Sequence, residues 1–320
     1  MSAPLRWGII GTGRIAHTFA RDMAFANHGV VAAVGSRSQE AADHFGREFS
    51  IERCHSSYEA LAADPEIDAV YIATPHPMHR ANALVALECE KPVLVEKSFT
   101  MDADEARDVV SVARAKGLFA MEAMWTRFLP HVVAIRELLA QGALGQIIAF
   151  EADHGKWFEK DPGSRLFAPE LGGSALLDLG VYPVSFASMV LGKPERVLAL
   201  VDPAFSGVDA QASMLLGYAN GAQSVLHCTS SARTPTRAAI SGTDARIEID
   251  ADFYAPTSFT LIGRDGTRER FDFETPGRGL HYQADEVARC LGEGLTESPF
   301  MALDETISIM ETMDQMRSFL

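Results

Sequence analysis

The chain has 320 residues, of which 47% are hydrophobic and 22% charged, and its formal net charge is −15. This length suits two domains, each large enough to bury its own core. The acidic balance argues against a nucleic-acid partner, because such proteins carry basic patches, and against an anionic membrane surface. No apolar run reaches the roughly 18 residues that span a bilayer, so we expect no membrane partner.

The cysteines argue against a disulfide framework. Cys54, Cys89, Cys228 and Cys290 are far apart and form no C-x-x-C pair, whereas disulfide frameworks and metal sites cluster their cysteines. The sequence also holds neither H-E-x-x-H nor G-x-S-x-G, the patterns of zinc and serine hydrolases. No secretory signal precedes the first strand. We therefore expect a cytoplasmic protein with reduced thiols and no metal site.

The first 125 residues alternate short apolar runs with amphipathic patterns. The runs predict strands at 5–10, 30–35, 69–74, 92–96 and 118–122, and the patterns predict helices at 14–26, 38–49, 77–90 and 102–116. Strands that alternate with helices of this length form a parallel sheet with right-handed crossovers. We therefore expect residues 1–125 to form a Rossmann-type, dinucleotide-binding domain.

After residue 125 the pattern changes. A helix near 130–141 precedes a strand at 146–154, an irregular segment and a helix from about 172 to 190. Further strands are predicted at 195–202, 212–218, 222–229, 236–241, 245–250, 257–263 and 268–273, and helices near 280–293 and 303–318 close the chain. Turn signals such as Asn220-Gly221 favour hairpins. We expect residues 126–320 to form an α+β domain with a large, mostly antiparallel open sheet, with a late helix packing back on the first domain.

The segment 7–16 holds the G-x-G-x-x-G/A spacing of a dinucleotide-binding turn, in Gly11, Gly13 and Ala16. The first glycine allows a tight turn, the second lets a pyrophosphate approach the backbone, and the small third residue allows helix–strand packing. The amides that open the following helix face the phosphates. We expect the cofactor to contact Gly11, Thr12, Gly13, Arg14 and Ile15.

The end of the second strand indicates which cofactor is bound. NAD enzymes usually place an acidic residue there, which accepts a hydrogen bond from the ribose 2′-hydroxyl, but this chain has Ser36 and Arg37. A guanidinium can hold a 2′-phosphate. We therefore expect NADP rather than NAD, the alternative being a solvated arginine at a helix start.

Two later strand ends also carry polar residues. The run ending in Glu96 and Lys97 closes one strand, and alternation sends the two side chains to opposite faces. The preceding strand leads to Thr74, His76 and His79. Ligands of open α/β sheets bind beyond the carboxyl ends of the strands. We expect these five residues to line the cofactor site, although a surface ion pair or a structural histidine would give the same pattern.

The helix from about 172 carries a second candidate pair. Asp178 and Tyr182 are four residues apart and would share one face. A phenol becomes an effective acid or base when an ammonium such as that of Lys97 lowers its pKa. The alternative is a core tyrosine satisfied by Asp178. The residues expected to shape a substrate pocket beside Tyr182 are Trp125, Arg127, Trp157 and Arg165.

Together these motifs resemble the Gfo/Idh/MocA oxidoreductases. The resemblance rests on the 11–16 turn, the Ala73-Thr-Pro segment with His79, the Glu96-Lys97 pair and the segment 172–182. Within the family, residues 121–128 and Tyr182 are most similar to dimeric dihydrodiol dehydrogenases and NADP-dependent D-xylose dehydrogenases. The resemblance implies NADP-linked oxidation of a cyclic sugar or diol, with Lys97 and Tyr182 as the catalytic pair. It also implies a C-terminal sheet that forms a substrate wall and a dimer face.

Two positions depart from the family pattern. The family usually has proline after the lysine, often with a cis bond, whereas Ser98 follows Lys97 here. Many relatives place aspartate three residues after the catalytic His or Tyr, where this chain has Ser185. Both departures bear on how the lysine is positioned and how a sugar is recognised.

The function expected from these residues is NADP(H)-dependent hydride transfer at a secondary hydroxyl of a monosaccharide or a trans-diol. Tyr182 would take the hydroxyl proton, Lys97 would hold the reacting oxygen, and Asp178 would support Tyr182. Two alternatives are an NAD-retaining glycosidase-like enzyme and a non-catalytic NADP-binding sensor or scaffold. We further expect a homodimer or higher homo-oligomer.

Overall fold

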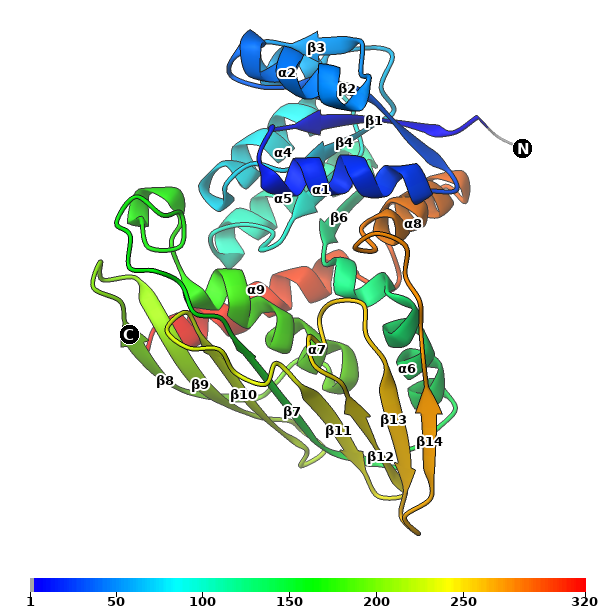
Figure 1. Ribbon diagram of the computed structural model, residues 1–320, viewed down its shortest axis with the longest axis vertical. Coiled ribbons are helices and arrows are strands. Elements are labelled where there is room, and N and C mark those ends of the chain that lie inside the picture. Colours follow the sequence, from blue (N-terminus) through cyan, green and yellow to red (C-terminus); the bar gives the residue numbers. More distant parts are fainter. Residues whose placement is uncertain (1–2) are drawn as a thin grey trace. The chain divides into compact units, whose positions relative to one another are not determined.

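The computed structural model describes residues 3–320, which form two compact units (Figure 1). The first unit comprises the chain up to Trp125 together with Pro276–Ile307, and the second comprises Thr126–Thr275 together with Ser308–Leu320. The division between residues 125 and 126 coincides with the boundary drawn from the sequence. The first unit, however, also contains a segment from near the end of the chain.

The first unit contains a six-stranded parallel sheet in the order β3-β2-β1-β4-β5-β6. Its strands are β1 Leu5–Ile10, β2 Gly29–Gly35, β3 Arg53–His55, β4 Ala69–Ile72, β5 Val93–Glu96 and β6 Ala120–Ala123. Every residue of β4, β5 and β6 is buried, as expected for strands covered on both faces. The predicted Rossmann-type sheet is confirmed.

Helices connect these strands, as the sequence predicted. They are α1 Arg14–Asp22, α2 Gln39–Phe49, α3 Tyr58–Ala62, α4 His79–Glu88 and α5 Ala103–Lys116, joined later by α8 His281–Gly292. The last helix, α9 Leu303–Arg317, begins in the first unit and ends in the second. Strand β3 and helix α3 were not predicted, because three and five residues are too few to show a periodic pattern.

Side-chain caps fix where several of these helices begin. The side chains of Ser38, Ser57 and Asp102 accept hydrogen bonds from the backbone N–H groups three residues on, at the starts of α2, α3 and α5. Helix α1 differs, because Gly13 precedes it and no side chain caps it. The amides of its first turn therefore remain available to a ligand.

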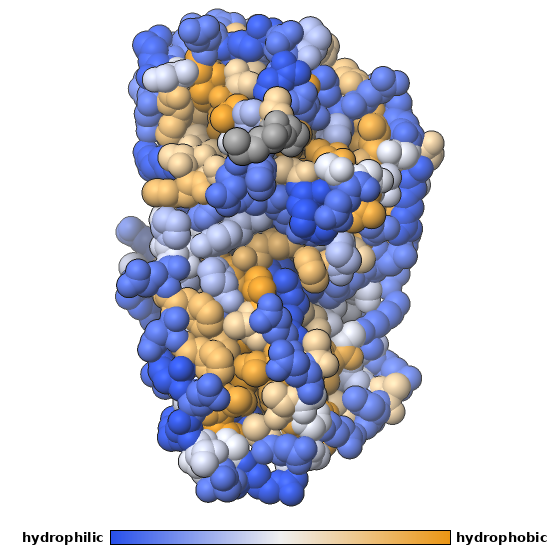
Figure 2. Space-filling model, turned by 90° about the vertical axis from the view of Figure 1, so that its right-hand side faces the viewer, coloured by the Kyte–Doolittle hydropathy of each residue, from blue (hydrophilic) through white to orange (hydrophobic). Residues whose placement is uncertain are grey.

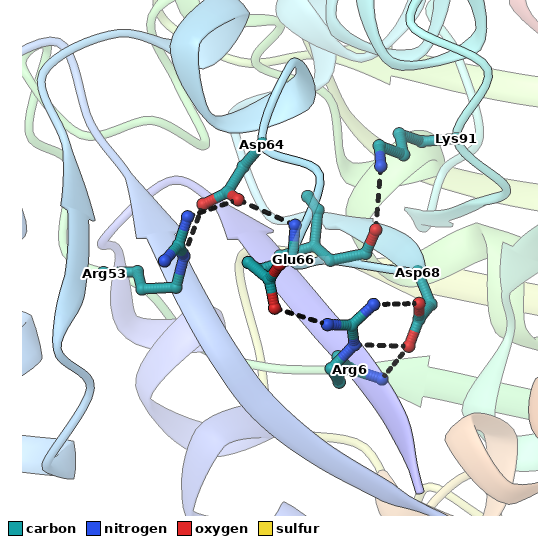
Figure 3. A network of polar contacts seen from close by, with 7 residues as sticks. Arg6, Arg53, Asp64, Glu66, Asp68 and Lys91 are labelled. Atoms are coloured by element: carbon teal, nitrogen blue, oxygen red, sulfur yellow. Dashed lines mark hydrogen bonds and ion pairs between the residues drawn. The ribbon is translucent and has the colours of Figure 1, made fainter. Parts of the chain in front are cut away.

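A polar network ties down the loop that leads into β4 (Figure 3). Arg6 on β1 donates two hydrogen bonds to the carboxylate of Asp68, at 3.0 and 2.8 Å, and a third to Glu66 at 2.8 Å. Arg53 on β3 forms a two-pronged pair with buried Asp64, at 2.7 and 2.6 Å. The Arg53 guanidinium holds the pKa of Asp64 well below its usual range. These pairs tie the loop between α3 and β4 to strands β1 and β3.

The second unit contains an eight-stranded sheet in the order β14-β13-β12-β11-β7-β10-β9-β8. Its strands are β7 Ile147–Gly155, β8 Arg196–Pro203, β9 Asp209–Gly217, β10 Gln223–Thr229, β11 Ala238–Gly242, β12 Ala245–Ile249, β13 Phe259–Gly263 and β14 Arg268–Phe271. Neighbours β7 and β10 run parallel and the other neighbouring pairs run antiparallel. The predicted large, mostly antiparallel sheet is confirmed.

Helices cover one face of this sheet (Figure 1). Helix α7 Val181–Leu191 packs on β7 and β10, and the ring of Phe186 stacks on Phe150 with centroids 5.3 Å apart. Helix α6 Pro130–Ala140 belongs to the same unit. On the opposite face, alternate residues of β8, β9 and β10 expose large apolar side chains, namely Leu198, Leu200, Leu215 and Val225.

The helical segment that leads into α7 differs from the sequence expectation. A continuous helix was expected from about residue 172, but a π-helical turn, Leu176–Gly180, precedes α7. The segment Pro169–Leu191 is also long and apolar enough to cross a membrane, which corrects the view that no such run exists. Because 72% of its most apolar window is buried inside the protein, it serves as a core helix here.

The face in Figure 2 is largely hydrophilic, with apolar residues gathered in patches.

Candidate active site

In the first unit, the turn from β1 into α1 fits a dinucleotide pyrophosphate. Gly11 adopts a φ of +105°, and a Cβ there would lie 3.0 Å from the carbonyl oxygen of Ala73, so a side chain is excluded. A Cβ at Gly13 would meet nothing within 4 Å, which leaves open space above the turn. The uncapped first turn of α1 begins with Arg14 and Ile15, and Ala16 is fully buried, as close packing of α1 requires.

The order of the strands places this turn at a ligand-binding position. The chain proceeds from β1 outward to β2 and β3, and then returns to β4 on the other side of β1. Ligands of open α/β sheets bind at such a switch point, beyond the carboxyl ends of the strands. Thr12 lies just after β1 there, and Ala73 and Thr74 follow β4. The N–H of Ala73 donates to the carbonyl of Ile10, at the end of β1, at 2.9 Å.

Ser36 and Arg37 follow β2 at the same edge. Ser36 is buried, and its hydroxyl accepts a hydrogen bond from the N–H of Ser38 at 3.4 Å. Arg37 is exposed. The nearby Tyr58 phenol is partly buried, which raises its pKa, and the Arg37 guanidinium opposes that rise. The structure therefore keeps a cation on the surface where a ribose 2′-substituent would lie.

The two histidines tie the end of β4 to the segment after β5. His79 is fully buried, with Nε2 lying 2.8 Å from the carbonyl oxygen of Thr74 and Nδ1 lying 2.9 Å from that of Ser98. Because carbonyls only accept, both contacts are hydrogen bonds only when both ring nitrogens carry a proton. His76 places Nε2 at 3.1 Å from the carbonyl oxygen of Lys97. Both side chains thus position backbone around Lys97.

Strand β5 ends in Glu96, and Lys97 follows it. Buried Glu96 accepts a hydrogen bond from the hydroxyl of Tyr71 at 2.5 Å, so its carboxylate belongs to the interior of the sheet domain. Lys97 is half-buried, in keeping with alternation along the strand. The Lys97–Ser98 peptide bond is cis although residue 98 is not proline.

Trp125 ends this unit's first segment, with the Arg278 guanidinium 5.9 Å from its ring centroid.

In the second unit, Tyr182 lies in a compact cluster of three rings. Its ring centroid is 4.6 Å from that of Tyr254 and 5.3 Å from that of His154, and His154 stacks on Tyr254 at 4.4 Å. All three residues are buried, with 7% of Tyr182 exposed. Lys156, just after β7, donates a hydrogen bond from Nζ to the Tyr254 hydroxyl at 2.7 Å. The cluster therefore combines two phenols, an imidazole and an ammonium.

A proline explains why His154 is part of this cluster. In an α-helix the N–H of residue 183 would donate to the carbonyl of Leu179, but Pro183 has no N–H. His154 Nδ1 lies 3.0 Å from that carbonyl oxygen and replaces the missing donor. The neutral imidazole therefore carries its proton on Nδ1. This hydrogen bond fixes the His154 ring against the first turn of α7, where Tyr182 lies.

Three other predicted site residues make local contacts within the second unit. Asp178 lies in the π-helical turn and pairs with Arg165, with Oδ1 2.9 Å from Nη2. Arg127 was expected in the pocket but is 2% exposed, and it donates to Ser185 through Nη2, at 2.7 Å to the carbonyl and 3.1 Å to Oγ. Arg127 thus holds α7 in place through Ser185.

Trp157 lines a cavity within the second unit. The side chain is 64% exposed, and it borders a cavity of about 280 Å³ together with Phe158, Phe167 and Phe205. The N–H of Phe158 donates to the carbonyl of Ser230 at 3.0 Å, which ties that part of the wall to the end of β10. Aromatic faces of this kind suit the apolar face of a sugar or an aryl ring.

Within residues 3–320 no group of three or more His, Cys, Asp or Glu side chains could hold a metal ion.

Two family models match most of the chain. The oxidoreductase family with an NAD-binding Rossmann fold matches residues 5–124, and the GFO/IDH/MocA C-terminal domain matches residues 132–248. The chain belongs to the Gfo/Idh/MocA family. It is therefore an NAD(P)-dependent oxidoreductase that acts on hydroxyl groups, as the residues predicted.

Curated members of the Gfo/Idh/MocA family are similar to this chain over nearly its whole length. Trans-1,2-dihydrobenzene-1,2-diol dehydrogenase of Sus scrofa is 38% identical, covering 98% of this chain and 96% of the relative. The enzyme of the same name from Xenopus tropicalis is 37% identical, covering 97% and 96%. The enzyme from Mus musculus is also 37% identical, covering 98% and 96%.

Solved structures share the fold of this family member. An aldose-aldose oxidoreductase from Caulobacter crescentus, complexed with glycerol, superposes with a TM-score of 0.90 at 23% identity, covering 99% of this chain and 97% of that one. A 3-ketoreductase from Actinomadura kijaniata, in complex with NADP and TDP-benzene, superposes with a TM-score of 0.86 at 25% identity, covering 98% and 97%.

Sequence reasoning did not single out three residues of the cluster around Tyr182, namely His154, Lys156 and Tyr254. None lies in a recognisable motif, and the fold of the sheet domain brings them together from the end of β7, from the residue after it and from the loop before β13. Pro183 was the one available signal for His154, because a proline in a first helical turn leaves an upstream carbonyl in need of another donor.

Proposed function

We propose that this protein is an NADP(H)-dependent dehydrogenase that oxidises a secondary hydroxyl of a monosaccharide or of a trans-diol. The observation that carries the proposal is the similarity, at 38% identity over 98% of the chain, to an enzyme named for a trans-diol. The pair expected to act on the hydroxyl is Lys97, which follows β5, and Tyr182, which lies in the first turn of α7. Bound NADP supplies the hydride acceptor.

The residues of the protein divide the remaining work. The Gly11–Gly13 turn and the uncapped start of α1 bind the pyrophosphate, and Ser36 with Arg37 selects the 2′-phosphate. Tyr182, held by its neighbouring rings, takes the proton of the reacting hydroxyl. Lys97, whose backbone His76 and His79 position, holds the reacting oxygen. Trp157 and the cavity beside it supply a wall for the substrate ring.

We also propose that a second copy of the chain covers the open face of the eight-stranded sheet. Leu198, Leu200, Leu215 and Val225 form an exposed apolar area there. Exposed apolar area of this kind is typical of protein interfaces. These four side chains carry no charge, which suits the pairing of two strongly acidic chains.

The test is turnover by single-residue variants. Wild-type protein is screened for NADP+ reduction with aldoses, inositols, anhydrosugars and aryl diols, and the best substrate is then used with Tyr182→Phe and Lys97→Met. Each variant is expected to lower kcat by at least about 100-fold, the usual contribution of an acid–base group. Near-full activity of either variant would remove that residue from the reaction.

The same screen separates the alternatives. Cofactor that stays bound through purification, with no net NADPH formed while a glycosidic bond is cleaved, would favour the glycosidase-like enzyme. Saturable NADP+ binding without turnover of any compound in the panel would favour a sensor or scaffold.

A further inference from the structure

Tyr254 brings a second phenol next to Tyr182. The two ring centroids are 4.6 Å apart and the planes are inclined by 43°. Tyr254 is buried, and His154 stacks on it at 4.4 Å. Two neighbouring phenols offer two hydroxyl groups, and only one is needed to take the proton of a reacting hydroxyl.

The backbone around Tyr254 is held on both sides by the segment that follows β6. The hydroxyl of Thr126 donates to the carbonyl of Tyr254 at 2.6 Å. Nε2 of His131, on α6, lies 3.1 Å from the carbonyl oxygen of Phe253 and donates to it. Both hydrogen bonds are buried. The backbone that carries the Tyr254 ring is therefore held within this unit, and recognition of a small polar group requires such support.

Lys156 determines the direction of the Tyr254 hydroxyl. Its Nζ lies 2.7 Å from the phenol oxygen and 4.9 Å from the ring centroid. An ammonium can only donate, so the phenol accepts this hydrogen bond and must give its own proton to a different acceptor. The ammonium also strengthens that donation, because a hydrogen bond from a charged group polarises the hydroxyl.

We propose that Tyr254, oriented by Lys156, donates a hydrogen bond to the hydroxyl next to the one that Tyr182 deprotonates, so that the enzyme selects vicinal diols over lone secondary alcohols. The proposal rests on the proposed function, since Tyr182 defines which hydroxyl reacts. Tyr254 is a specificity-determining residue in this scheme and Lys156 is its positioning residue. A site built to bind a substrate hydroxyl rejects the analogue that lacks it.

The test compares two substrates that differ by one hydroxyl, trans-cyclohexane-1,2-diol and cyclohexanol. The full-length protein is assayed with NADP+, and the ratio of kcat/KM for the diol to that for the alcohol is measured. Wild-type is expected to favour the diol by at least about 100-fold. Tyr254→Phe and Lys156→Met are expected to lower the ratio at least about tenfold, the effect of one lost hydrogen bond. Most of this loss should appear as a higher KM for the diol, and kcat/KM for cyclohexanol should fall less than kcat/KM for the diol.

Matched controls separate recognition from structural support. Tyr218, in the same unit, is a buried phenol whose hydroxyl bonds Ser224 Oγ at 3.2 Å, and Lys193 is an exposed ammonium paired with Glu311 at 2.7 Å. Tyr218→Phe and Lys193→Met should leave the ratio unchanged. If Tyr254→Phe and Lys156→Met slow both substrates equally, their role is structural and the proposal fails.

A binding measurement keeps the inference independent of turnover. Isothermal titration of trans-cyclohexane-1,2-diol into the protein with NADPH, which cannot accept a hydride, is expected to show weaker binding for Tyr254→Phe than for Tyr182→Phe, because Tyr182→Phe keeps the second hydroxyl contact. Equal diol affinity in wild-type and Tyr254→Phe overturns the proposal. Absence of any diol oxidation by the wild-type protein would instead contradict the proposed function, and the titration would still decide the role of Tyr254.

Discussion

Arg37 is the residue on which the choice of cofactor depends. It follows β2 directly, is exposed, and lies beside the partly buried Tyr58. The interaction with Tyr58 keeps the Arg37 guanidinium near the end of β2, and a 2′-phosphate needs a cation held there. The comparisons establish binding of NAD or NADP, and Arg37 is the reason for proposing NADP.

Replacing Arg37 should therefore separate the two cofactors. One charged hydrogen bond contributes about 1.5–3 kcal/mol, so Arg37→Ala is expected to weaken NADP+ about ten- to hundredfold while sparing NAD+. Titration calorimetry with both cofactors measures this, and Arg47→Ala, on α2, serves as the exposed-arginine control. Equal weakening of both cofactors would show that Arg37 does not contact the 2′-phosphate.

His131 makes stability depend on pH in a defined window. Burial lowers the pKa of His131 to about 4, although its hydrogen bond to the Phe253 carbonyl opposes the shift. Between the unfolded pKa near 6.5 and this lower value, the unfolded chain takes up a proton that the folded chain does not. The free energy of unfolding should thus fall as the pH drops from about 6.5 to 4, by up to about 3 kcal/mol from this group.

The variant His131→Gln keeps a donor for the Phe253 carbonyl and removes the titration. Urea unfolding of both proteins between pH 7 and pH 4 should show a smaller loss of stability for the variant. His28→Gln, at an exposed position of the first unit, is the control and should keep the wild-type pH dependence. Parallel curves for wild-type and His131→Gln would show that His131 is not the titrating group.

At the scale of elements, the sequence predicted the fold well wherever local chemistry determines it. Helices α2 and α5 begin where Ser38 and Asp102 cap them, and the parallel sheet follows from alternating strands and helices. The π-helical turn before α7 was not predictable, because no residue of Leu176–Gly180 by itself favours i to i+5 hydrogen bonding. Because Asp178 lies in that turn, its spacing from Tyr182 is not that of a regular α-helix, on which the expected shared face depended.

The candidate site likewise combines residues that the sequence predicted with residues that it did not. Gly11, Gly13 and Lys97 were predictable because each lies in a short motif at the end of a strand. Lys156 and Tyr254 were not predictable, because they lie 98 residues apart in the chain. They meet through the register of β7 and through the loop whose backbone Thr126 holds. The contact of Arg127 with Ser185 was not predictable for a related reason, since Ser185 lies on a helix 58 residues away. Contacts of high sequence separation carry no local pattern.

At the scale of the whole molecule, the acidic charge and the open sheet have opposing effects on self-association. A net charge of −15 on each chain makes two copies repel one another. Leu198, Leu215 and Val225 are cross-strand neighbours on β8, β9 and β10, so they form a continuous row across the sheet. Burying such a row against a second copy would gain about 25 cal/mol per Å² of apolar area.

A single charge on that row should therefore break the proposed dimer. Leu200 is 70% exposed on the same face, and Leu200→Glu would place a buried, unpaired carboxylate in the interface and add to the repulsion. Wild-type is expected to elute as a dimer or larger oligomer in size-exclusion chromatography with light scattering, and Leu200→Glu as a monomer. Leu295→Glu, which adds the same charge to an exposed site of the first unit, is the control and should remain oligomeric. Salt gives a second test, because it screens the repulsion between the two acidic chains. The dimer of the wild-type protein should dissociate less readily as salt rises from 0.01 to 0.15 M, over which the Debye length falls from about 30 to 8 Å. A monomeric wild-type protein at assay concentration, or an unchanged Leu200→Glu oligomer, would contradict pairing through this face.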